Sequence, residues 1–260
     1  MSDYIKLKDI IKQFPFKKGD NIFLTSDVKQ LLYSCMEHND DTDLNVFIDS
    51  IIEVIGEEGT LVIPTFNWGF CKGQPFDYYK TPCKTGSLGK IALKRDDFKR
   101  TKHPIYSFAV WGKGQAELCA MNNKSSFGAD SPFTYVTKHH FQNLFVDKDC
   151  QHSFVYVHYV EEQVGISYRY LKDFTADYTD EFGVTKQATY SMNVRDLDLD
   201  VFITIYPLEE DFVKAGVSKR YKVNDIDYKV IDLAGAYPII ADDVKHNRSR
   251  KVSTYIGQDD

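Results

Sequence analysis

The sequence predicts an α/β protein with a mainly parallel central sheet flanked by helices, and an additional antiparallel section in its C-terminal half. In the first two thirds of the chain, short apolar runs alternate with helical segments, which favours a parallel sheet. From Arg169 the pattern changes to aromatic, alternating, strand-like pieces. There is no internal repeat and no long linker, so we expect one domain over 1–260. Its α/β part (1–168) and its antiparallel, substrate-side part (169–260) are expected to share one core.

The N-terminal elements follow from hydrophobic patterning and from turn residues. Pro15 and the turn at 18–20 separate a first helical segment from an apolar strand, and the capping residues at 25–27 follow that strand. Gly56 closes a clear amphipathic helix that leads into a β-prone run. The elements expected here are helices at 6–13, 28–38 and 43–55 and strands at 21–24 and 60–64.

The later elements are less regular. Alternating and β-prone runs predict strands, while apolar residues at helical spacing predict the helices between them. The elements expected here are helices at 87–95 and 153–164 and strands at 108–111, 143–146, 188–192 and 200–205.

Composition and charge exclude several classes of protein. The chain has 260 residues, 43% of them hydrophobic and 14% aromatic, which is enough for a sizeable core and excludes a disordered protein. The net charge of −6 argues against a nucleic-acid partner, for which a basic surface is expected. No apolar run is long enough to span a membrane, and the N-terminus does not resemble a signal peptide. We therefore expect a cytoplasmic protein with no membrane partner.

A basic segment interrupts this acidic chain. Residues 80–102 contain eight basic and two acidic residues, a net charge of +6 that leaves −12 for the rest. Such a local field attracts a polyanion. For Lys90, Lys94 and Arg95 a solvated helix face is the simpler interpretation. The stretch 100–104 is different, because Pro104 keeps His103 out of a helix and an extended loop with such donors suits phosphate.

One pair of residues suggests acid–base chemistry. His158 precedes Glu161 by three residues, so both side chains lie on one face if the segment is helical. A carboxylate that orients an imidazole is the usual construction of a general base near neutral pH. By itself the spacing is more often found in a structural pair.

The cysteines and the remaining histidines give weaker signals. Five cysteines without a Cys-x-x-Cys motif indicate neither a disulfide framework nor a zinc site. Cys150 near His158 leaves a nucleophilic thiol as a minor alternative. His139 and His140 have no third ligand at a suitable spacing, so we expect no metal site.

Five short motifs share their order and spacing with one known family. They are 59–66 (GTLVIPTF), Thr85-Gly86 before a helix, His103-Pro104 with 107–112 (SFAVWG), 127–133 (FGADSPF) and 158–161 (HYVE). Over most of its length the chain resembles the aminoglycoside 3-N-acetyltransferase family of CoA-dependent N-acyltransferases.

The resemblance implies direct transfer of an acyl group from acetyl-CoA, or another acyl-CoA, to an amine, without a metal. His158 would be the general base and Glu161 would orient it. The residues that the resemblance places at CoA are Thr25, Ser26, Thr65, Arg100, His103 and Ser107.

The substrate side is less defined. Asp130 and Ser131 lie in a Gly-Ala-Asp-Ser-Pro turn, where a helix cap and a contact with a substrate hydroxyl or amine are both open. Tyr168 is expected to pack in the core or to stack on a sugar at the active site.

Three departures from the family pattern bear on the substrate. Thr25-Ser26-Asp27 replaces a His-Ser-Ser-like sequence, and 147–149 (DKD) replaces a glycine-rich turn. Val155 stands where the family commonly has a threonine, three residues before the histidine. These changes favour an amine other than the usual drugs and leave the donor for the thioester oxygen unassigned.

The leading hypothesis is therefore an N-acyltransferase that acts on an amino sugar, most plausibly a nucleotide-linked amino sugar for surface polysaccharide synthesis. Arg169, Lys172 or the 245–251 segment would then contact its pyrophosphate. The alternative is an aminoglycoside 3-N-acetyltransferase that confers antibiotic resistance. A non-catalytic CoA-binding protein is a further alternative, against which the intact His158 and Glu161 argue. The expected partners are small molecules, and a monomer and a homodimer both remain open.

Overall fold

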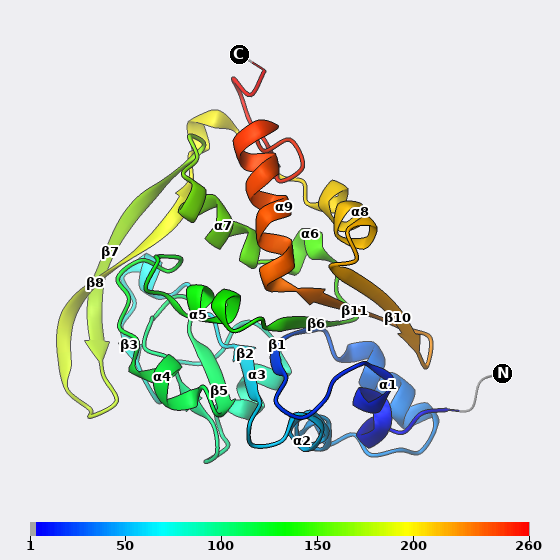
Figure 1. Cartoon of the computed structure of the whole chain (residues 1–260). Helices are drawn as coiled ribbons and strands as arrows, with labels where there is room; N and C mark the ends of the chain where they lie inside the picture. The colour runs from blue at the N-terminus through cyan, green and yellow to red at the C-terminus, as the bar shows by residue number, and fades with distance from the viewer. Residues whose placement is uncertain (1–3, 260) are drawn as a thin grey trace.

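A computed structural model describes residues 4–259, and within them a seven-stranded sheet forms the centre of the molecule (Figure 1). Its strand order is β10-β11-β6-β1-β2-β5-β4. The middle strands β6, β1 and β2 are parallel, and the strands on both sides pair antiparallel. The strands are β1 (Asn21–Ser26), β2 (Thr60–Pro64), β4 (Lys99–Arg100), β5 (Phe108–Gly112), β6 (Gln142–Val146), β10 (Ser218–Val223) and β11 (Ile226–Asp232).

Each face of the sheet buries its own apolar core, because successive side chains of a strand point to opposite faces. In β1, for example, Phe23 packs into one core while Ile22 and Leu24 pack into the other. On the face of Ile22 and Leu24 lie the 3-10 helix η1 (Leu7–Gln13), α1 (Lys29–Glu37), α2 (Leu44–Ile55) and α3 (Ser87–Ala92).

The opposite face carries the helices that matter most for the site. They are α4 (Gln115–Ala120), α5 (Pro132–Lys138), α6 (Cys150–Ser153), α7 (Tyr156–Val164), α8 (Tyr206–Lys214) and α9 (Leu233–His246). Helix α7 packs against α9, and Figure 1 shows both helices above the sheet, with α1 and α2 below it.

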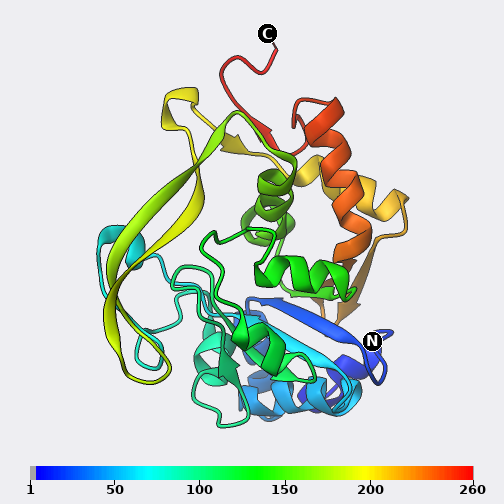
Figure 2. The same cartoon turned by 60° about the vertical axis from the view of Figure 1, so that its left-hand side comes forward.

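A long hairpin stands beside this layered core. Strands β7 (Arg169–Thr179) and β8 (Thr185–Arg195) pair antiparallel over their whole length, and the short β3 (Phe76–Asp77) adds to β7. Figure 2 shows the hairpin passing across the side of the molecule, with its β7 start next to α7. The remaining elements are η2 (Phe70–Lys72), η3 (Leu197–Leu199), β9 (Phe202–Ile203) and β12 (Ser253–Thr254), the last two pairing with each other.

The predicted α/β class is confirmed, including the parallel centre of the sheet and the antiparallel pairing in the C-terminal half. Strands β10 and β11 lie in the central sheet, so the C-terminal part does not form one separate antiparallel layer. Most helices and strands lie within two or three residues of their predicted positions.

Three expected elements differ in detail. The helix predicted over 6–13 is a 3-10 helix, and the strand predicted over 200–205 is reduced to Phe202–Ile203. The helix predicted over 153–164 corresponds to α7, which begins only at Tyr156, because a separate short helix, α6, ends at Ser153 and its C-cap residue Phe154 leaves the helical conformation (φ −86°, ψ 68°). This break matters because it starts α7 two residues before His158.

Candidate active site

His158 and Glu161 form a hydrogen-bonded pair on helix α7. Their spacing places both side chains on one face of the helix, and the Nδ1 atom of His158 lies 2.6 Å from Oε2 of Glu161. The Glu161 side chain is fully buried, whereas the His158 side chain keeps 15% of its surface exposed. The carboxylate is therefore hidden behind the ring, and the ring reaches open space.

Tyr168, which directly precedes β7, and Arg169, the first residue of β7, contact Glu161 from its other sides. The Tyr168 hydroxyl donates to Oε1 of Glu161 at 2.7 Å, and Nε of Arg169 lies 3.1 Å from Oε2. A buried carboxylate needs such partners, because an uncompensated charge in the interior is costly. The hairpin and helix α7 thus meet at this carboxylate.

The charged groups around His158 shift its pKa in opposite directions. Burial lowers the pKa of His158 below its ordinary value of 6.5, and the positive charge of Arg169 lowers it further, while Glu161 opposes this shift. Burial alone would raise the pKa of Glu161, but His158, Arg169 and Tyr168 together lower it. At neutral pH the pair therefore consists of a neutral imidazole and a carboxylate, which is the form that can accept a proton.

His158 lies where two cavities meet. The first cavity, of about 530 Å³, opens at the ends of β1 and β2. The second, of about 430 Å³, lies between α7 and the β7–β8 hairpin. Four residues line both cavities: Trp68, Tyr106, His158 and Ile203. A molecule in either cavity can therefore reach the imidazole.

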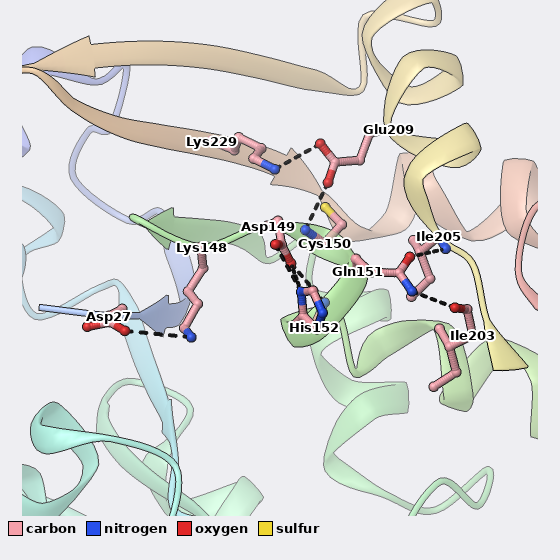
Figure 3. A network of polar contacts seen from close by, with 10 residues as sticks. All are labelled: Asp27, Lys148, Asp149, Cys150, Gln151, His152, Ile203, Ile205, Glu209 and Lys229. Atoms are coloured by element: carbon pink, nitrogen blue, oxygen red, sulfur yellow. Dashed lines mark hydrogen bonds and ion pairs between the residues drawn. The ribbon is translucent and has the colours of Figure 1, made fainter.

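The first cavity has polar and basic walls. Thr25 and Ser26 are the last two residues of β1, and Lys29, Lys84 and Lys148 supply three cations. Lys148 lies 3.7 Å from Asp27 (Figure 3). The walls approach closely because α3 begins with a Ser-Leu-Gly sequence. A Cβ on Gly89 would lie 2.5 Å from the Pro64 carbonyl oxygen.

Helix α6 forms polar contacts with the chain segment that lines this cavity. Gln151 donates to the Ile203 carbonyl and accepts from the Ile205 backbone N–H at 2.7 Å (Figure 3). These contacts fix the chain segment that carries Ile203 into both cavities. On the other side of α6, Glu209 accepts from the Cys150 backbone N–H and pairs with Lys229 at 2.8 Å.

The sequence-predicted CoA residues fall into two groups. Thr25 and Ser26 line the first cavity, and their contact with CoA stays a prediction. Thr65, Arg100 and Ser107 are buried instead: the Arg100 guanidinium donates to the Ser107 hydroxyl and to the carbonyl oxygens of Thr65, Tyr78 and Thr81. These bonds use four of the five guanidinium N–H groups, so Arg100 has a structural role here, and its predicted CoA contact stays a prediction.

His103 is likewise part of the interior. It is 1% exposed, and its Nδ1 accepts from the backbone N–H groups of Ile105 and Tyr106. Burial lowers the pKa of His103 to about 3, so the ring is neutral. The ring helps to fix the turn after Pro104, and the expected phosphate contact stays a prediction, against which its burial and neutral charge argue.

The three predicted substrate residues line neither of the two cavities. Asp130 is exposed, and Ser131 is the buried N-cap residue of α5. Neither lines the first or the second cavity. Tyr168 is 1% exposed and bonds Glu161, so it supports the carboxylate, and this position favours the expected core packing over stacking on a sugar.

Sequence reasoning missed several residues around His158. Trp68 and Tyr106 lie in loops, and Arg195 lies at the end of β8, where no local pattern marks them. Lys148 lies in the Asp147-Lys148-Asp149 sequence. That sequence departs from the family pattern, and this departure was the signal that could have drawn attention to Lys148. Val155 lines the first cavity beside His158, so the wall carries a methyl group where a hydroxyl is expected.

The minor alternatives find no geometric support. The Cys150 side chain is fully buried, and burial raises the pKa of its thiol. Among residues 4–259, no group of three potential metal ligands occurs, and no helix is long and apolar enough to cross a membrane.

A neutral imidazole, backed by a buried carboxylate, lies between two cavities on an α/β fold, an arrangement that suits the transfer of a group between two bound molecules. The sequence model of the aminoglycoside 3-N-acetyltransferase family matches residues 25–242, and the chain belongs to this family. It is therefore a CoA-dependent N-acyltransferase, as the motifs had indicated.

Solved structures share its fold at low sequence identity. The YokD protein from Bacillus subtilis is 19% identical with a TM-score of 0.74, and covers 93% of this chain and 97% of its own. AAC-VIa with bound sisomicin is 16% identical with a TM-score of 0.75, at 94% and 99% coverage. A binary complex of AAC-IIIb with CoASH is 13% identical with a TM-score of 0.75, at 94% and 98% coverage. No curated protein matches the sequence.

Proposed function

We propose that the protein transfers an acetyl group from acetyl-CoA directly to an amino group of an amino sugar, with His158 as the general base. One observation carries this proposal: the imidazole of His158 lines both cavities, while its Nδ1 atom is held by Glu161. With Nδ1–H bonded to the carboxylate, Nε2 is left as the proton acceptor. The base thus stands where a thioester from one side and an amine from the other can meet.

The chemical step follows from this arrangement. Nε2 of His158 takes a proton from the amine as its nitrogen attacks the thioester carbonyl, because a protonated amine is not nucleophilic. The new C–N bond forms, the C–S bond breaks, and the proton passes from His158 to the leaving thiolate. Glu161 stabilises the imidazolium that exists between these events.

The first cavity is the better site for acetyl-CoA. It has about 530 Å³ of space, hydroxyl groups at Thr25 and Ser26, and the cations Lys29, Lys84 and Lys148 for phosphate groups. Lys84 comes from the basic segment of the sequence. The second cavity is then left for the acceptor amine.

Family comparisons favour an aminoglycoside as the acceptor. Sisomicin is bound in AAC-VIa, and apramycin is bound in a variant of AAC(3)-IVa. No comparison supports the nucleotide-linked amino sugar that the sequence departures had suggested. Aminoglycosides are therefore the first acceptors to test.

The test measures thiol release from acetyl-CoA with sisomicin, apramycin and glucosamine, and identifies the acetylated amine by mass spectrometry. We expect His158→Asn to lower kcat by about 10²- to 10⁴-fold, the usual contribution of a general base, with acetyl-CoA binding retained. His139→Asn is the matched control, because His139 is an exposed histidine outside both cavities.

Two outcomes would contradict the proposal. Equal rates for wild type and His158→Asn would remove the histidine from the reaction. Binding of acetyl-CoA without transfer to any amine would favour a CoA-binding protein without catalysis.

A further inference from the structure

The second cavity is lined by three basic side chains. Arg169 and Lys172 come from β7, and Arg195 comes from the end of β8. Within residues 4–259 no aspartate or glutamate lines this cavity. The charge here is the reverse of what a polycationic ligand needs, because like charges in a partly enclosed cavity repel.

Neither Lys172 nor Arg195 is neutralised by a carboxylate. In the described part of the chain neither forms an ion pair; Lys172 Nζ lies 5.7 Å from the centre of the Phe174 ring. Arg195 donates to the Val201 carbonyl oxygen at 3.1 Å. Both charges are therefore available to a ligand.

Arg169 adds a buried nitrogen that lacks a partner. Its side chain is 6% exposed, and its Nη1 donates to the Asn193 carbonyl oxygen. Its Nη2 is buried and, among residues 4–259, has no hydrogen-bond partner. A buried donor left unsatisfied is costly, and native structures usually supply it with an acceptor.

Strand register brings two of these cations together. Arg169 and Arg195 are directly opposite each other in the β7–β8 ladder. Like charges at opposite positions destabilise a sheet. Glu161 contacts Arg169, but it also bonds His158 and Tyr168, so it offsets only part of the positive charge.

We propose that Arg169, Lys172 and Arg195 form an anion-binding subsite for the acceptor, and that the preferred acceptor is an amino sugar carrying a phosphate or carboxylate group. This inference rests on the proposed function and narrows its acceptor class. Guanidinium and ammonium groups are the side chains best suited to phosphate and carboxylate.

The same field assists the chemical step. Positive charges near an ammonium group lower its pKa, since they disfavour the charged form. An acceptor whose anionic group occupies the subsite thus has its amine beside His158 in a region that favours the neutral nucleophile. A polycationic aminoglycoside places several charges against the same three side chains.

The experiment compares kcat/KM for glucosamine 6-phosphate, UDP-glucosamine, an amino uronic acid, glucosamine and sisomicin. We expect at least one anionic amine to exceed both glucosamine and sisomicin. The three anionic amines distinguish a phosphate monoester, a nucleotide-linked pyrophosphate and a carboxylate as the source of the charge. A preference for glucosamine or sisomicin would overturn the inference and leave the proposed function intact.

Variants of the cavity lining test whether this preference depends on Lys172 and Arg195. Lys172→Met and Arg195→Gln are each expected to raise KM for the best anionic amine about tenfold, with KM for acetyl-CoA unchanged. Lys186→Met is the matched control, because Lys186 is exposed near the far end of the same hairpin. A change confined to KM for acetyl-CoA would assign these cations to CoA and overturn the inference.

A binding measurement tests the subsite without turnover. Inorganic phosphate is titrated calorimetrically into protein saturated with CoA, which fills the first cavity. Binding that weakens in Lys172→Met and Arg195→Gln but not in Lys186→Met supports the subsite; no binding, or binding equal in all variants, refutes it. Failure of all amines to react would instead refute the proposed function.

Discussion

The imidazole of His158 and the carboxylate of Glu161 are joined at 2.6 Å, with Glu161 fully buried and His158 open to two cavities. The buried member of the pair fixes the tautomer, and the exposed member can contact a ligand. This division of roles requires the helix to begin where it does, because α7 starts at Tyr156 after the break at Phe154.

Glu161→Gln is expected to lower kcat by roughly ten- to a hundredfold, because an amide supports the imidazolium less than a carboxylate does. KM for acetyl-CoA is expected to stay unchanged. Steady-state kinetics checks both. Glu162→Gln is the control on the same helix: its Oε1 accepts from Ser125 at 2.5 Å, and it lines neither cavity in the described chain. Equal losses in the two variants would indicate a general effect on the helix.

Tyr168→Phe is expected to lower the free energy of unfolding by about 1.5 to 3 kcal/mol, since it removes a hydrogen bond to a buried charged group. The rate is expected to fall less than tenfold, because His158 and Arg169 still hold Glu161. Chemical denaturation and steady-state kinetics measure the two effects. A Tyr168→Phe variant with full stability but a hundredfold lower rate would mean that Tyr168 touches the substrate.

The sequence was informative where local patterns determine structure. Helical spacing paired His158 with Glu161, and the apolar run 21–24 predicted the strand that the structure has as β1 (Asn21–Ser26). The sequence was less informative where burial determines what a polar side chain does. Arg100 and His103 stand in a basic, extended segment that reads as an exposed loop, but the fold covers them and uses their polar atoms internally.

The second cavity is the clearest case of information that the sequence lacks. Arg169 and Arg195 are 26 positions apart in the chain, and only strand register places them opposite each other. Their joint relation to His158 then depends on how the hairpin packs on α7. No periodicity within either strand carries that relation.

Arg100→Met and Lys84→Met are expected to change different properties of the protein: the first its stability, the second its KM for acetyl-CoA. Arg100→Met removes a buried guanidinium that donates four hydrogen bonds, and it is expected to lower the free energy of unfolding by about 3 kcal/mol, or the melting temperature by roughly 6 to 12 °C. Lys84→Met is expected to leave stability unchanged and to raise KM for acetyl-CoA about three- to tenfold, because Lys84 lines the first cavity. Thermal melts and kinetics separate the two. A raised KM for acetyl-CoA in an Arg100→Met variant of normal stability would support the predicted contact of Arg100 with CoA.

Cys150→Ser is expected to retain the wild-type rate. The thiol is fully buried and lies outside the cavity lining that its neighbours Gln151 and His152 form, and burial raises its pKa, so it is not a thiolate at neutral pH. Quenched-reaction mass spectrometry is expected to find no acetylated enzyme. A trapped acetyl group on Cys150, or a variant with a strongly reduced rate, would instead establish a covalent intermediate.

The pH dependence of kcat/KM distinguishes His158 from other bases. The base acts in its neutral form, and its pKa lies below 6.5 because of burial and the charge of Arg169, so activity is expected to rise with pH through a value below 6.5 and then level. Glu161 raises this pKa, so Glu161→Gln is expected to move the acid limb to lower pH. Arg195 lowers the same pKa, so Arg195→Gln is expected to move it to higher pH. Profiles between about pH 5 and 9 measure both displacements. Because the two variants change opposite charges around one ring, shifts in the same direction would show that another group is titrating.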